Sequence, residues 1–81
     1  MVNIKTSEKF ERILDKLDKS IKIQLDRLVD KIISNPEIGK PMRYDRKGTR
    51  EVYLSSFRLS YAYDKDSDSL YLLDIYHKDE Q

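Results

Sequence analysis

Residues 50–77 read REVYLSSFRLSYAYDKDSDSLYLLDIYH, and this stretch decides the fold of the chain. It contains three runs rich in β-branched residues, aromatic residues and leucine, the composition typical of β-strands. Two serines separate the first run from the second, and the segment KDSDS at residues 65–69 separates the second from the third. Two residues suffice for a very tight hairpin, and aspartates suit a type I turn. The stretch therefore predicts three consecutive strands joined by two hairpins.

The segment that ends before Pro36 has the periodicity of helices instead. Apolar residues recur at the i, i+3, i+4 and i+7 spacing of one helix face, which predicts two amphipathic helices in a tight hairpin. Thr6 or Ser7 can cap the first helix, and Asp18 or Ser20 can cap the second. The apolar positions are Phe10, Ile13, Leu14 and Leu17 in the first helix and Ile21, Leu25, Leu28, Val29 and Ile32 in the second.

One more short strand is predicted ahead of the helices by the alternating segment VNIKT at residues 2–6. The element order is then β-α-α-β-β-β. Each helix has one apolar face that needs a surface to cover, and an antiparallel sheet of about four strands supplies it. We expect an α+β fold with the helical hairpin on one face of the sheet. A chain of 81 residues has room for one core, so residues 1–81 form a single domain.

The composition argues against several kinds of active site. The chain has no cysteine, which excludes disulfides and thiolate zinc sites. Gly39 and Gly48 are its two glycines, too few for a glycine-rich phosphate loop. His77 lacks the partners of a catalytic triad, and the segment DKDSD at residues 64–68 lacks the glycine and the glutamate of a calcium loop. We therefore expect no cofactor and no bound metal.

No apolar run approaches the roughly 18 residues of a membrane-spanning helix, and no secretory signal is recognisable. We expect a cytoplasmic protein without membrane contact.

The charge is unevenly distributed, although its sum is only +1. Residues 40–63 carry six basic and two acidic side chains, and residues 64–81 carry two basic and six acidic ones. The basic middle of the chain predicts contact with a polyanion. RNA can be cleaved without a metal, because its own 2′-hydroxyl attacks the adjacent phosphate when a base, a cation and an acid are in place. Arginine suits the cationic role, and histidine, lysine or tyrosine can fill the others.

Four segments, in this order, resemble the RelE/ParE superfamily of toxin–antitoxin toxins over essentially the whole chain. They are FERILDKLDKSIKIQLDRLVDKIISNP at residues 10–36, GKPMRYDRKG at 39–48, REVYLSSFRLSY at 50–61 and LYLLDIYHKDE at 70–80. The resemblance implies a compact toxin that a small RelB-like antitoxin neutralises, with operator DNA bound only through the toxin–antitoxin complex. RelE-like members are ribosome-dependent endoribonucleases that cleave mRNA, whereas ParE-like members poison DNA gyrase. A gyrase inhibitor, or a weak relative that only binds its antitoxin, is therefore the alternative to a nuclease.

The resemblance also implies roles for individual residues. Arg58 matches the strand arginine that contacts the scissile phosphate, and Arg43 matches a loop arginine that positions phosphate. The implied catalytic residues are Arg58, His77, Lys78 and Tyr76, and the implied RNA-binding residues are Arg43, Arg46, Lys47 and Arg50. A nuclease of this kind requires Arg43, Arg58 and His77 to meet in one shallow hollow.

Two departures from the pattern stand on the first strand of the three-strand stretch. Well-studied RelE toxins have two lysines there, and this chain has Glu51 and Tyr53. Arg58 has an alternative structural role, an ion pair with an acid across the sheet such as Asp74.

Overall fold

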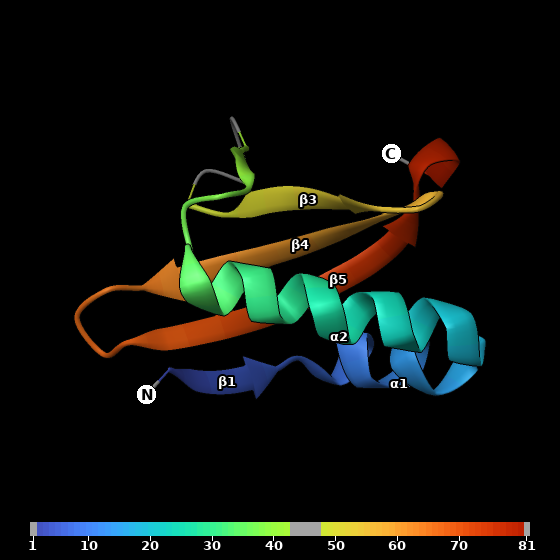
Figure 1. The fold of residues 1–81 in the computed structure, drawn as a ribbon, viewed down its shortest axis with the longest axis horizontal. Coiled ribbons are helices and arrows are strands. Elements are labelled where there is room, and N and C mark those ends of the chain that lie inside the picture. Colours follow the sequence, from blue (N-terminus) through green and yellow to red (C-terminus); the bar gives the residue numbers. More distant parts are fainter. Residues whose placement is uncertain (1, 43–47, 81) are drawn as a thin grey trace.

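The computed structural model describes residues 2–42 and 48–80, without the side chain of Glu80. In this described part of the chain, two α-helices and five strands build one compact unit (Figure 1). None of the described helices is long and apolar enough to cross a membrane. The elements are β1 (Asn3–Thr6), α1 (Glu8–Lys16), α2 (Lys19–Ser34), β2 (Lys40–Pro41), β3 (Arg50–Leu54), β4 (Phe57–Asp64), β5 (Ser69–His77) and a C-terminal 3₁₀ turn (Lys78–Glu80).

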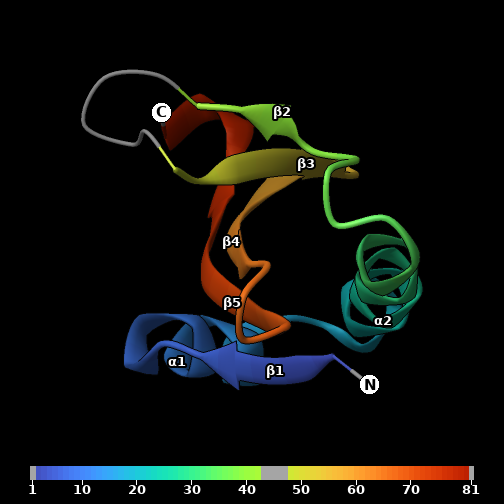
Figure 2. The same cartoon turned by 90° about the vertical axis from the view of Figure 1, so that its left-hand side faces the viewer.

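The sheet has the strand order β1-β5-β4-β3-β2, which Figure 2 shows from β1 at the bottom to β2 at the top. The three predicted strands β3, β4 and β5 form an antiparallel meander, so the α+β prediction is confirmed. Two details differ from the expectation of about four antiparallel strands. β1 lies parallel beside β5, and the two-residue strand β2 pairs with β3 where only a loop was expected.

Local side chains explain where the elements begin and turn. The Ser7 hydroxyl accepts the Phe10 N–H at 2.9 Å and so caps α1, and Asp18 accepts the Ile21 N–H at 3.0 Å and caps α2. This hydrogen bond lowers the pKa of Asp18 below its ordinary value. The predicted two-serine turn joins β3 to β4, with Ser55 at a positive φ of 56°.

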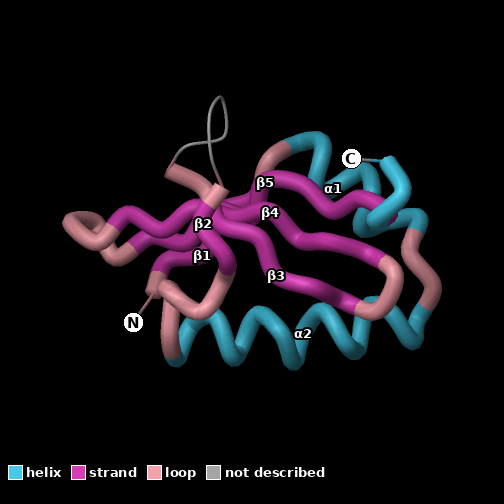
Figure 3. The backbone as a smooth tube through the Cα atoms, turned by 90° about the horizontal axis from the view of Figure 1, so that it is seen from above, coloured by secondary structure: helices cyan, strands magenta, loops and turns pink. Residues whose placement is uncertain are grey.

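A β-bulge in β5 ties the first helix to the sheet. Ser60 pairs with Asp74 and Tyr61 with Leu72, so Leu73 has no partner on β4. The Ser7 hydroxyl donates to the Leu73 carbonyl at 2.6 Å, which fixes the start of α1 beside β5. Seen from above, α2 runs along the sheet next to β3 (Figure 3).

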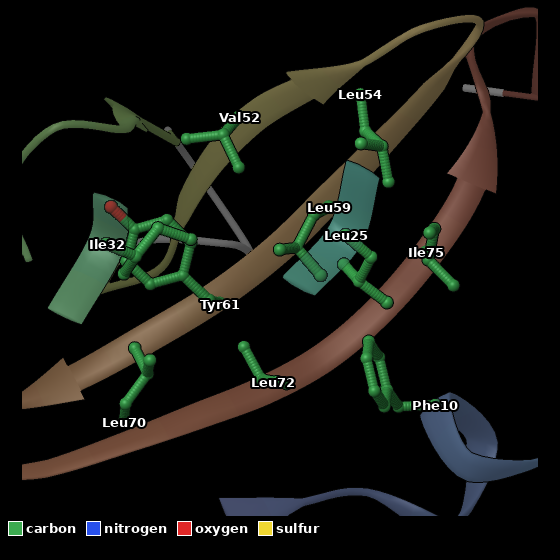
Figure 4. Packing of buried hydrophobic residues seen from close by; sticks show 10 residues of the cluster. All are labelled: Phe10, Leu25, Ile32, Val52, Leu54, Leu59, Tyr61, Leu70, Leu72 and Ile75. Carbon is green, nitrogen blue, oxygen red and sulfur yellow. The ribbon is translucent and has the colours of Figure 1, made fainter. Parts of the chain in front are cut away.

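The core lies between α2 and the sheet, and α1 contributes Phe10 to it (Figure 4). Its buried residues are Phe10, Leu25, Ile32, Val52, Leu54, Leu59, Tyr61, Leu70, Leu72 and Ile75.

Tyr61 is the one tyrosine among these core residues, and its hydroxyl both accepts and donates a hydrogen bond. It accepts the Gly39 N–H at 2.9 Å and donates to the Pro36 carbonyl at 2.8 Å. Burial raises the pKa of Tyr61 above its ordinary value. A Cβ at position 39 would stand 2.7 Å from the Tyr61 hydroxyl, so this close approach requires glycine. Tyr61 therefore fastens the loop that follows α2 to the centre of the sheet.

Replacing Tyr61 by phenylalanine tests this fastening. The variant leaves the Gly39 N–H and the Pro36 carbonyl without their partner, and we expect it to lower the free energy of unfolding by about 1–3 kcal/mol. Denaturant unfolding measures the change. Tyr71→Phe is the control, because Tyr71 is a half-buried residue of β5 whose ring faces Lys5. We expect it to lower the free energy of unfolding by less than Tyr61→Phe does. Equal losses of stability in both variants would contradict the role of the Tyr61 hydroxyl.

Candidate active site

Three strands direct side chains to one place on the face of the sheet turned away from α2. Arg58 on β4 lies opposite Tyr53 on β3 and opposite Tyr76 on β5. Successive side chains of a strand point to opposite faces. Leu59 enters the core, so Arg58 projects from the other face, and Glu51 and Tyr76 project with it.

A buried carboxylate organises this cluster. Glu51 is only 4% exposed, and its Oε1 atom lies 3.0 Å from Nη1 of Arg58. The Tyr76 hydroxyl donates to Oε2 of the same carboxylate. A buried ion is tolerated only where it is paired and hydrogen-bonded. The two oxygens of Glu51 thus hold a cation on one side and a phenol on the other.

The arginine is itself positioned from two directions. Its guanidinium lies over the Tyr53 ring, 4.2 Å from the centroid, a cation–π contact. The hydrogen bond with Glu51 raises the pKa of Arg58 further above its ordinary value. The Arg58 side chain keeps 22% of its surface exposed, so a permanently charged group remains within reach of solvent.

His77 does not join Arg58, because the two side chains point to opposite faces of the sheet. His77 pairs with Phe57, and the two rings meet edge to face with centroids 5.6 Å apart. Its Nδ1 atom lies 3.5 Å from the Asp79 carboxylate. The expected meeting of Arg58 and His77 in one hollow is wrong for this reason.

The remaining predicted site residues fall into three groups. Lys78 is exposed on the C-terminal 3₁₀ turn, where its backbone N–H donates to the Ser56 carbonyl at 2.9 Å. Arg50 donates through Nη1 to the carbonyls of Glu37 and Gly39, at 3.1 and 2.8 Å, and so braces the loop before β2. The predictions for Arg43, Arg46 and Lys47 lie outside the described residues.

Glu51 is the site residue that the sequence interpretation missed. In the sequence it stands out only as a departure from a family pattern, and Asp74 is the acid given there as the alternative partner of Arg58. Asp74 instead lies 3.1 Å from Lys9 of α1. The available signal was the alternation in REVYL, which sets Glu51 on the face opposite Val52.

The family model of the ParE-like toxin of type II bacterial toxin–antitoxin systems matches residues 4–80 of the chain. The chain therefore belongs to this family, within the RelE/ParE superfamily that its motifs resemble. No curated protein sequence matches it.

Solved toxin structures share its fold at low sequence identity. The toxin in the crystal structure of the intact RelBE toxin–antitoxin complex of E. coli is 15% identical, with a TM-score of 0.82 over 95% of this chain and 96% of that one. The match to the RelBE2 toxin–antitoxin complex of Mycobacterium tuberculosis has 24% identity and a TM-score of 0.77 over 95% and 98%. A YoeB/ParE toxin from Agrobacterium tumefaciens is 12% identical, with a TM-score of 0.85 over 94% and 98%. The fold is that of these toxins.

The coupling between Glu51 and Arg58 is measurable by a double-mutant cycle. Arg58→Met leaves a buried carboxylate without its cation, so we expect a clear loss of stability, part of which Glu51→Gln restores in the double variant. Denaturant unfolding of the four proteins gives the coupling energy. The Lys9–Asp74 pair, with Lys9 63% exposed, is the matched control and should couple by at most about 1 kcal/mol. A Glu51–Arg58 coupling no larger than this would show that the pair does not organise the cluster.

Proposed function

We propose that this toxin is a metal-independent endoribonuclease that cleaves mRNA, on the ribosome, as the RelE-like resemblance implies. The hollow expected to join Arg58 to His77 is not its site, since these side chains point to opposite faces of the sheet; Glu51 and Tyr76 take the proton-transfer roles instead. The observation that carries the proposal is the Glu51 carboxylate held between the Arg58 guanidinium and the Tyr76 phenol. These are a base, a cation and an acid, the three groups that cleavage by the RNA's own 2′-hydroxyl requires.

The proposed steps use each group once. Glu51 removes the proton of the 2′-hydroxyl, whose oxygen then bonds to the adjacent phosphorus. Arg58 stabilises the charge that develops on the phosphate oxygens. The bond from phosphorus to the 5′-oxygen breaks, and Tyr76 donates its proton to that oxygen. The products are a 2′,3′-cyclic phosphate and a 5′-hydroxyl, and the proton held on Glu51 returns to Tyr76 along their hydrogen bond.

The other basic residues receive supporting roles in this proposal. Lys78, exposed beyond β5, adds positive charge near the RNA, and His77 is left for contacts on the far side of the strand. Arg50 acts as a positioning residue through the loop carbonyls that it binds. Arg43, Arg46 and Lys47 remain proposed phosphate contacts.

A RelB-like antitoxin is the proposed partner. Solved neighbours from E. coli and Mycobacterium tuberculosis are toxins in complex with their antitoxins, and the family model describes type II systems. On this proposal operator DNA is bound only through the toxin–antitoxin complex, and the ribosomal target places the activity in the cytoplasm.

A gyrase inhibitor or a non-cutting relative is the second candidate, and one observation favours it. Nη1 of Arg58 is already occupied by Glu51 at 3.0 Å, as expected of an arginine whose role is structural. The two candidates differ in whether mRNA is cut.

Induced expression of the toxin, followed by mapping of mRNA 5′ ends, separates them. We expect new 5′-hydroxyl ends in coding regions, and we expect Glu51→Gln, Arg58→Ala and Tyr76→Phe each to reduce cleavage by about 10²–10⁴-fold, because each removes one of the three groups. Tyr71→Phe, outside the site, should cleave as the parent does. Denaturant unfolding checks that each variant is folded at the assay temperature.

If growth stops and DNA supercoiling is inhibited while mRNA stays intact, the nuclease proposal is wrong and the gyrase inhibitor is favoured. If the Glu51→Gln variant is folded and cleaves mRNA as fast as the parent, Glu51 is not the base.

A further inference from the structure

Two hollows meet along the outer edge of β3, one of about 400 Å³ and one of about 200 Å³. Both are lined by Leu28 and Lys31 of α2 and by Tyr53. The larger one also reaches Lys40 and Glu51, and the smaller one reaches Arg27. We call these two neighbouring hollows together the β3 groove. It runs along the β3 edge between β3 and α2, and the candidate active site lies around this edge, on the face of the sheet turned away from α2.

The groove lies along an open sheet edge. β2 pairs only with Arg50 and Glu51, so no other strand in the described part of the chain covers the edge from Val52 to Leu54. Tyr53 stands on this edge strand, on the same face as Arg58, and is 61% exposed. The Arg58 guanidinium lies over its ring, 4.2 Å from the ring centroid. A large, exposed aromatic surface thus stands beside the reactive cluster.

The charges of α2 distinguish this groove from the one on its other side. Arg27 and Lys31 face the β3 groove together with Lys40. Asp26 and Asp30 instead line an apolar hollow of about 540 Å³ among β1, α1 and α2. The helix therefore presents a basic side to the β3 edge and an acidic side to β1 and α1.

We propose that the β3 groove binds the single-stranded RNA that continues from the cleavage site around the β3 edge, with one base stacked on Tyr53 and the backbone held by Lys31, Arg27 and Lys40. This inference rests on the proposed nuclease function and adds its substrate path. An aromatic platform beside basic side chains is the arrangement that binds single strands, since every base has a face to stack and every linkage a charge. A peptide strand added to the open edge is the competing occupant, and the basic rim and the exposed ring favour RNA over it.

Binding of a 2′-O-methyl oligonucleotide tests the groove without cleavage, because the blocked hydroxyl cannot attack. The chain has six tyrosines and no tryptophan, so stacking on Tyr53 quenches tyrosine emission, and fluorescence anisotropy of a labelled oligonucleotide gives the Kd. We expect Tyr53→Leu to weaken binding about 10-fold and to abolish the Tyr53 share of the quenching, and Tyr53→Phe to retain the affinity because the ring remains.

Lys31→Ala tests the backbone contact independently of the Arg58 stack. One lost phosphate contact should reduce the salt dependence of log Kd by about 0.7. Lys22→Ala is the control on the same helix. It lies nine residues away, on about the opposite side of α2, and should leave both affinity and salt dependence unchanged.

The outcomes separate this inference from the nuclease proposal. If oligonucleotide binding depends on the Tyr53 ring and on Lys31 but ordinary RNA is not cleaved, the RNA-binding groove is supported and the nuclease proposal is rejected. Cleavage with equal oligonucleotide affinity in the parent, Tyr53→Leu and Lys31→Ala overturns the groove and retains the nuclease. A peptide of alternating glutamate and valine that binds in a Lys31-dependent way, while the oligonucleotide does not bind, overturns the RNA assignment in favour of strand addition.

Discussion

The pairing of β4 with both of its neighbours is the constraint on which the rest of the molecule depends. Its alternation sends Leu59 and Tyr61 into the core and Arg58 to the opposite face. A register shift of one residue would exchange these sets and bury the guanidinium among the apolar side chains of α2. The hydrophobic free energy of the core therefore fixes the place of the charged cluster. The geometry of the candidate active site is a consequence of how the sheet packs on its helix.

The two helices and the strands β3, β4 and β5 followed from the sequence because each has a local cause. Helical periodicity, the serine and aspartate caps and the two-serine turn all act within a few residues of one another. The position of β1 could not be predicted in this way, since its parallel pairing with β5 depends on a strand more than sixty residues away. The same holds for the bulge at Leu73, which is stabilised by the distant Ser7 hydroxyl.

The candidate site was only partly predictable, because the sequence shows which residues follow one another but not which residues pair across strands. Arg58 and Tyr76 were named from the sequence and lie opposite each other on adjacent strands. Their shared partner, Glu51, is diagonal to Arg58 across the β3–β4 hairpin, so its role depends on strand register. His77 follows Tyr76 directly in the chain, and this adjacency is what sends it to the other face. Neighbours in sequence on a strand are poor candidates for one site.

Glu51 and Arg58, the base and the cation of the proposed mechanism, are paired with each other in the structure. A phosphate that enters must compete with the Glu51 carboxylate for Arg58, so part of the substrate's binding energy is used to open that pair. Contacts remote from the reacting phosphate can supply this energy. An RNA strand anchored on Tyr53 and on the basic edge of α2 would release Glu51 to act as the base only when the strand is correctly placed. Cleavage would then depend on binding beyond the scissile linkage, because a short RNA lacking those contacts leaves the ion pair closed.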